Sequence, residues 1–189
     1  MEAKGSFQIA CVGSNHDAEE LDLAARALKV LGYAGVQLTK RERPDIEAVL
    51  GGKRIGIELS AAHADEVPGV KGSALRRENE KQAGSAQGYW VPANPTTPLL
   101  ARMRAKDSVA RTFDWHSELW LLITTQHPDL RAVAATYLSK AFVAESLRSN
   151  IFDEFLQNTV FDVVCVFLPY DKTVFRWSDD TWHEVHISS

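Results

Sequence analysis

Short runs of apolar residues and longer amphipathic segments alternate along the chain. The short runs predict strands at residues 7–12, 36–39, 46–50, 53–60, 119–124, 161–168 and 173–177, with the last of these at the sheet edge. Helical spacing of apolar positions predicts helices at residues 17–31, 73–83, 99–111 and 129–147. Strands interleaved with helices predict an α/β sandwich. We expect one domain over residues 1–189, with a Pro/Gly-rich loop at about 84–98.

The most informative pattern is a predicted β-hairpin. The runs at 46–50 and 53–60 are separated by Gly51 and Gly52, which can adopt the positive φ angles of a two-residue turn. If Leu50 faces Lys53, pairing outward along the two strands places Asp45 opposite Glu58. In this register Glu47 and Ser60 share the face of the acidic pair, and the opposite face is apolar, with Ile46, Ala48, Ile55, Ile57 and Leu59.

Two carboxylates directly opposite each other on a hairpin repel. A divalent cation offsets that repulsion, because Mg²⁺ is typically held by one or two carboxylates together with waters and substrate phosphates. The alternative is a solvent-exposed hairpin face on which Arg43 and Lys53 screen the two charges. The geometry of the hairpin alone does not separate these interpretations.

The residues around this pair resemble a known nuclease motif. Arg43, Pro44 and Asp45, followed by the strand that ends in Glu58, Leu59 and Ser60, are similar to the PD-(D/E)XK nuclease superfamily. In that family a Pro-Asp on one strand is followed, one hairpin later, by an acidic residue, any residue and a lysine. Ser60 departs from the pattern because it stands at the lysine position, and some branches of the superfamily supply the lysine from a neighbouring helix instead.

The resemblance implies a restriction-endonuclease-like fold: a central mixed sheet whose hairpin carries the acidic pair, with helices on both faces. It implies a nuclease acting on DNA, in which Asp45, Glu58 and the Leu59 carbonyl bind Mg²⁺, with Mn²⁺ as an alternative. The metal would activate a water for attack on a phosphodiester. Glu20 is either an outer metal ligand or an acid favoured near a helix N-terminus.

The remaining catalytic expectations follow from the departure at Ser60. Lys81 is the expected substitute for the motif lysine, since the helix at 73–83 could direct it toward the hairpin, and Lys53 or Lys71 would be the next candidates. The side chains expected to contact DNA phosphates are Arg43, Lys53, Arg76 and Arg77.

Composition and charge bear on the expected partners and cellular location of the protein. The net charge of −4 argues against nonspecific coating of nucleic acid, yet residues 40–111 carry 13 Lys and Arg against 9 Asp and Glu. The two cysteines, Cys11 and Cys165, lie in apolar strand-like runs, as expected of buried thiols in a reducing compartment. We therefore expect a soluble cytoplasmic protein without membrane segments. A homodimer fits the resemblance, although no interface is identified.

Two other functions remain open. A nuclease-like fold that has lost catalysis could serve as a module that binds nucleic acid or protein, and a small-molecule-binding protein could use the turn at residues 13–16. A lysine or glutamine that reaches Asp45 and Glu58 would favour the enzyme, whereas a pair facing only solvent or an apolar wall would favour binding. His183 and His186, near the C-terminus, are expected to be exposed polar residues rather than metal ligands.

Overall fold

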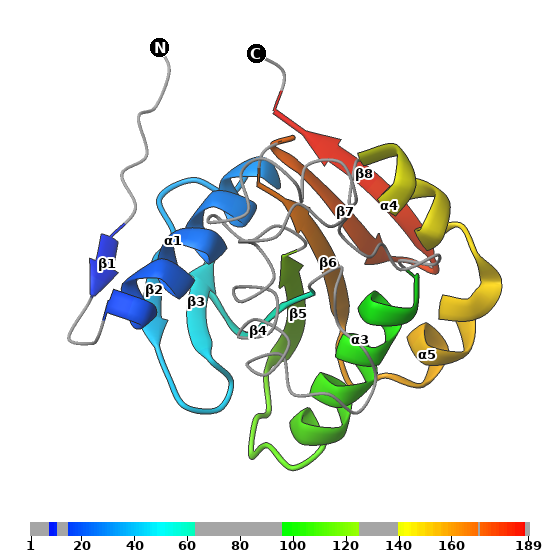
Figure 1. The fold of residues 1–189 in the computed structure, drawn as a ribbon. Helices are drawn as coiled ribbons and strands as arrows, with labels where there is room; N and C mark the ends of the chain where they lie inside the picture. Colours follow the sequence, from blue (N-terminus) through cyan, green and yellow to red (C-terminus); the bar gives the residue numbers. More distant parts are fainter. Residues whose placement is uncertain (1–7, 11–14, 63–95, 125–139, 170, 188–189) are drawn as a thin grey trace, which may run out of the picture.

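The computed structural model describes residues 8–10, 15–62, 96–124, 140–169 and 171–187 (Figure 1). Within these residues, eight strands form one sheet, in the same order as they follow each other in the sequence. The strands are β1 (Gln8–Ala10), β2 (Gln37–Lys40), β3 (Ile46–Leu50), β4 (Lys53–Ala61), β5 (Glu118–Thr124), β6 (Val163–Leu168), β7 (Thr173–Ser178) and β8 (Thr181–His186). The helices are α1 (Asn15–Val30), α3 (Thr96–Ala110), α4 (Lys140–Leu147), the 3₁₀ turn η2 (Asn150–Phe152) and α5 (Asp153–Asn158).

The sheet is mixed, as the alternation of strands and helices predicts. β1 runs parallel to β2, and β2, β3 and β4 form an antiparallel meander. β4, β5 and β6 are parallel to one another, and β6, β7 and β8 form a second antiparallel meander. The parallel pairs are separated in sequence by helices, because a parallel connection has to cross over one face of the sheet.

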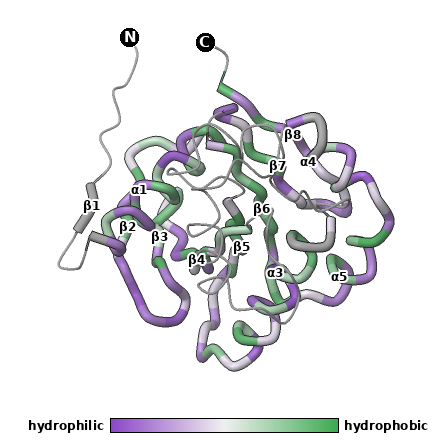
Figure 2. Tube along the Cα trace, in the orientation of Figure 1, coloured by the Kyte–Doolittle hydropathy of each residue, from purple (hydrophilic) through white to green (hydrophobic). Residues whose placement is uncertain are grey.

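Side chains of the central strands alternate between two hydrophobic clusters, one on each face of the sheet. On β5, Trp120 and Leu122 belong to the cluster packed against α1, whereas Leu119, Leu121 and Ile123 belong to the cluster packed against α3, α4 and α5. We call these sides the α1 face and the α3 face. Figure 2 shows that hydrophobic residues line β6 while hydrophilic residues gather in the peripheral connections. Burial on both faces explains the unbroken apolar runs of β5 and β6.

The predicted hairpin is confirmed, including its register. Gly51 and Gly52 have φ angles of +56° and +84°, and Leu50 pairs with Lys53 across the two-residue turn. Pairing continues outward to Ile46 and Ile57, so the next position places Asp45 opposite Glu58. The apolar residues of the hairpin point to the α1 face, which leaves the acidic pair on the side of α3.

In the C-terminal half, one prediction is wrong and one helical segment was not predicted. The strand β7 is not the sheet edge, because β8 pairs with it. β8 carries His183 and His186, and both are exposed. Residues 150–158 form η2 and α5, which the sequence analysis missed. The predicted helix at 73–83, the loop at 84–95 and the first part of the helix at 129–147 lie outside the described residues. Within the described residues, no helix combines the length and apolar character needed to cross a membrane.

Candidate active site

Asp45 and Glu58 meet at the end of the hairpin that lies away from its turn. Glu58 is near the C-terminal end of β4 and is only 4% exposed, while Asp45 immediately precedes β3. The Leu59 amide donates a hydrogen bond of 2.8 Å to Asp45 Oδ2, and the Asp45 amide lies 3.4 Å from Glu58 Oε2. The Asp45 carboxylate is thus held by the backbone next to Glu58, and the Glu58 carboxylate is held by the backbone of Asp45. These two contacts fix the orientation of both side chains.

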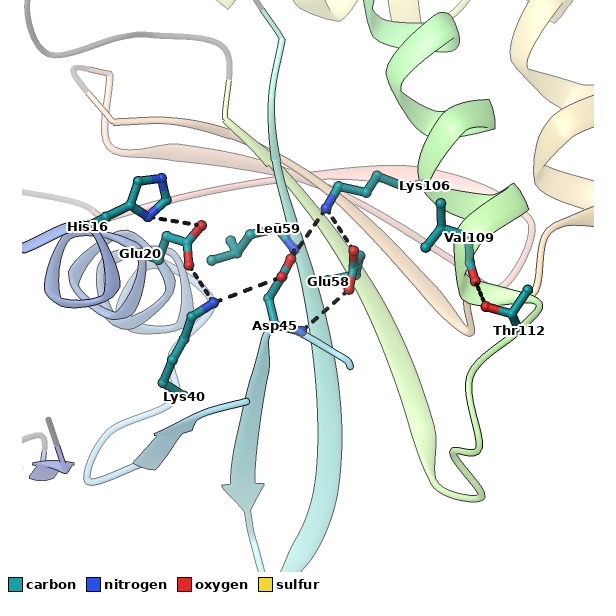
Figure 3. Close-up of polar contacts among 9 residues, drawn as sticks. All are labelled: His16, Glu20, Lys40, Asp45, Glu58, Leu59, Lys106, Val109 and Thr112. Carbon is teal, nitrogen blue, oxygen red and sulfur yellow. Dashed lines mark hydrogen bonds and ion pairs between the residues drawn. The ribbon is translucent and has the colours of Figure 1, made fainter. Parts of the chain in front are cut away.

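The counter-charge for this pair comes from Lys106 on α3 (Figure 3). Its Nζ lies 2.7 Å from Glu58 Oε1 and 3.4 Å from Asp45 Oδ2. The expected lysine, Lys81, lies outside the described residues. A signal for Lys106 was nevertheless present, because it falls at helical spacing from Met103 and Ala110 and so belongs, with Asp107, to the side of the helix that is buried.

Burial and charge act in opposite directions on these groups. Removal from water, followed by the nearby charge of Asp45, raises the pKa of Glu58, and the hydrogen bond from Lys106 offsets part of that rise. Burial works against the Lys106 ammonium, but its hydrogen bond to Glu58 and the charge of Asp45 outweigh burial and raise its pKa. Lys106 is therefore a cation at neutral pH and is poorly suited to accept a proton.

A second cation, Lys40, approaches Asp45 from the α1 face. Its Nζ lies 3.9 Å from Asp45 Oδ1 and 2.5 Å from Glu20 Oε2, and Glu20 Oε1 lies 3.5 Å from His16 Nδ1. Asp45 is thus placed between two lysines, as Figure 3 shows. Glu20 is linked to the acidic pair through Lys40, so its expected part in metal binding is at most indirect.

Ligand atoms of His16, Asp17 and Glu20 lie within 4.8 Å of one another at the start of α1. A metal ion can bridge such a group, but exposed acidic groups commonly show this spacing without one. His16 is largely exposed, and the Glu20 carboxylate is already engaged by Lys40.

The other predicted residues fall at different places. Ser60 is half-buried, one position past Leu59 and on the same face as Glu58. Arg43 is exposed in the turn before Asp45. Lys53 is exposed at the far end of β4, roughly 16 Å from Glu58 along the strand, so the prediction that it could replace the motif lysine is wrong. Lys71, Arg76 and Arg77 lie outside the described residues.

The alternative of a solvent-exposed hairpin face is also wrong. Glu58 is buried, and Lys106 rather than Arg43 or Lys53 compensates the charges of the acidic pair.

Comparison of the chain with protein-family models, curated proteins and solved structures finds no match. The chemistry of the site therefore has to be inferred from its own residues. The carboxylates of Asp45 and Glu58 can ligate a hard cation, and the Lys106 ammonium can bind an anion next to them.

Proposed function

We propose that the chain is a metal-dependent phosphodiesterase that cleaves DNA, with its active site at Asp45, Glu58 and Lys106. The observation that carries this proposal is the position of Lys106, whose ammonium lies within 3.4 Å of both carboxylates. The resemblance to PD-(D/E)XK nucleases requires a lysine next to the acidic pair. Ser60, which stands at the motif position of that lysine, does not supply one. A lysine reaching the pair is also the feature that separates an enzyme from a binding module.

We propose the restriction-endonuclease-like fold on related grounds. Its expected features are a mixed sheet, helices on both faces and an acidic pair carried by a hairpin. The mixed sheet with its two hydrophobic clusters and the hairpin at β3 and β4 are consistent with that architecture.

The donor set fits a magnesium ion. Asp45, Glu58 and the Leu59 carbonyl would offer the oxygen ligands that Mg²⁺ prefers, leaving the remaining positions to water and phosphate. When bound, the ion would supply a water of lowered pKa and charge compensation for the phosphate oxygens. Mn²⁺ would be accepted by the same ligands.

The residues of the chain have separate parts in this proposal. The Leu59 amide holds Asp45 Oδ2, so this carboxylate keeps its orientation before and after substrate binds. Lys106, which remains protonated, donates hydrogen bonds to a non-bridging phosphate oxygen and stabilises the extra negative charge that develops there. Glu58 is kept close to Lys106 and away from bulk water, which strengthens the attraction between the two charges.

The test is cleavage of plasmid and single-stranded DNA in Mg²⁺ or Mn²⁺. We expect metal-dependent cleavage by the wild-type chain, and a loss on the order of 10²-fold or more in each of Asp45→Asn, Glu58→Gln and Lys106→Met. Lys29→Met, which removes an exposed lysine from α1, is the matched control and should cleave like wild type. Cleavage that survives in all three site variants, each shown to be folded by circular dichroism, would place the activity elsewhere.

The second candidate is a nuclease-like module that binds nucleic acid or protein without catalysis. The observation in its favour is the charge balance of the site, because Lys106 and Lys40 already bring two positive charges to the acidic pair and so reduce its need for a metal. This candidate predicts no cleavage with either metal, and a melting temperature that millimolar Mg²⁺ leaves unchanged. A rise in melting temperature with Mg²⁺ that disappears in Asp45→Asn would contradict it.

A further inference from the structure

Two arginines share one glutamate on the α3 face of the hairpin, next to the acidic pair. Glu47 accepts hydrogen bonds from Arg54 Nε at 3.0 Å and from Arg54 Nη2 at 2.9 Å, and the Arg41 guanidinium contacts the same carboxylate. We call Arg41, Glu47 and Arg54 the arginine clamp. Its function is not explained by the proposed chemistry at Glu58.

The clamp has more positive charge than the hairpin needs. One guanidinium would neutralise Glu47, whose pKa is lowered by the hydrogen bond from Arg54 and further by Arg41, so the carboxylate stays ionised and the clamp has a net charge of +1. The Glu47 side chain is 15% exposed, whereas those of Arg41 and Arg54 are 47% and 55% exposed. A guanidinium has five N–H donors, and the hydrogen bonds to Glu47 use only some of those on Arg41 and Arg54 within the part of the chain that the structure describes.

Packing holds the clamp in place. The Arg54 guanidinium lies over the Trp115 ring, 5.4 Å from its centroid. Trp115 and Pro44 pack closely over Gly56, since a Cβ added there would lie 2.8 Å and 2.6 Å from them. Arginine held by an aromatic ring and a carboxylate loses little conformational entropy when it binds a further anion.

The clamp is also connected to the acidic pair. Arg41 donates its backbone N–H to the Asp45 carbonyl at 2.8 Å, and Glu47 lies two residues after Asp45 on the same face of the hairpin. Two residues of a strand span roughly 6.6 Å, close to the rise of about two nucleotides along a nucleic-acid strand. A phosphate bound by the clamp would therefore be one or two nucleotides away from a phosphate at Glu58.

We propose that Arg41 and Arg54 bind backbone phosphates of a DNA strand and direct that strand along the β3–β4 hairpin to Asp45 and Glu58. Charge complementarity selects this occupant, because fixed guanidiniums with N–H donors beyond those bonded to Glu47 match phosphate oxygens. The choice of DNA rests on the proposed function. The clamp itself predicts binding that does not require cleavage, so the two proposals can fail separately.

The test is fluorescence anisotropy of a labelled DNA strand of about 20 nucleotides, titrated with the full chain in EDTA so that no cleavage occurs. The key variant is Arg41→Gln/Arg54→Gln. The matched control is Arg104→Gln/Arg148→Gln, which removes two exposed arginines: Arg104, which lines a cavity of α3 together with residues of α5, and Arg148, which directly follows α4. Because loss of both arginines leaves Glu47 uncompensated, a triple variant that adds Glu47→Gln removes the repulsive carboxylate and guards against unfolding.

Each lost phosphate contact should weaken binding of the single strand roughly fivefold at 0.1 M salt and lower the slope of log affinity against log salt by about 0.7. We expect at least about a tenfold loss in the double and triple variants and a smaller loss in the control. If the triple variant has the same affinity and salt slope as the control variant, the proposal is overturned and the clamp is a structural ion triad. Equal binding of a polyglutamate peptide would instead assign an acidic protein as the occupant. Loss of DNA binding without any cleavage by wild type would support the clamp and reject only the nuclease.

Discussion

Replacement of Lys106 by methionine tests the central contact of the site. The substitution keeps the length and apolar stem of the side chain and removes the ammonium that serves both Glu58 and Asp45. Removal of one partner of a buried ion pair typically costs about 3 to 5 kcal/mol, because the other charge stays buried without compensation. Lys106 is 26% exposed at its side chain, so solvent screens part of the effect and we expect about 2 to 3 kcal/mol.

Urea unfolding at pH 7 measures this cost, with Lys29→Met as a control that should stay within about 0.5 kcal/mol of wild type. Loss of the ammonium also raises the pKa of Glu58 further, since Lys106 normally lowers it. Protonation of Glu58 then removes the uncompensated charge, so the gap between Lys106→Met and wild type should narrow as the pH falls. The double variant Glu58→Gln/Lys106→Met should recover much of the loss. A Lys106→Met cost below about 0.5 kcal/mol at pH 7, or one that does not change with pH, would refute the assigned ion pair.

Three further variants test the surroundings of the site. Gly56→Ala should cost about 1 to 3 kcal/mol in urea unfolding, because its Cβ would lie 2.6 Å from Pro44 and 2.8 Å from Trp115; a cost near zero would contradict that packing. The pKa of Glu58 is raised in the folded state, so its contribution to stability is present below pH 4.5 and is lost as the pH rises through the folded pKa. Glu58→Gln should therefore lower the free energy of unfolding less at pH 7 than at pH 4.5. The folded pKa of Glu47 is lowered, so Glu47→Gln should show the opposite trend, with its cost greatest above pH 4.5 and lost as the pH falls through the folded pKa. Unfolding curves at several pH values check both signs, and parallel trends for the two glutamates would contradict their assigned environments.

Local patterns were enough to predict the hairpin and its register. Gly51 and Gly52 define a two-residue turn, and the alternation of apolar residues on β3 and β4 excludes a slip by one position. The buried strands β5 and β6 were equally clear, since continuous apolar runs report burial on both faces. The position of Asp45 opposite Glu58 followed from the register alone.

Contacts between distant segments were not predictable in the same way. Lys106 is 48 residues from Glu58, and its approach depends on how α3 packs on the sheet. The link from Glu20 through Lys40 to Asp45 likewise depends on α1 lying against β2. The strand β8 was missed because its side chains are mostly exposed, so an apolar run of the kind that marks β5 is absent.

The position of Lys106 determines how a metal can enter this site. An acidic pair that lacks an internal cation depends on a metal to relieve repulsion, whereas Lys106 already compensates part of the charge of Asp45 and Glu58. A divalent ion would therefore have to displace or share this ammonium, and its affinity for the free protein should be modest. A substrate phosphate changes the balance, because it supplies a new partner for Lys106 and further oxygen ligands for the ion. If the proposed function holds, the site would bind metal together with DNA, and the arginine clamp would deliver the phosphate that makes this possible.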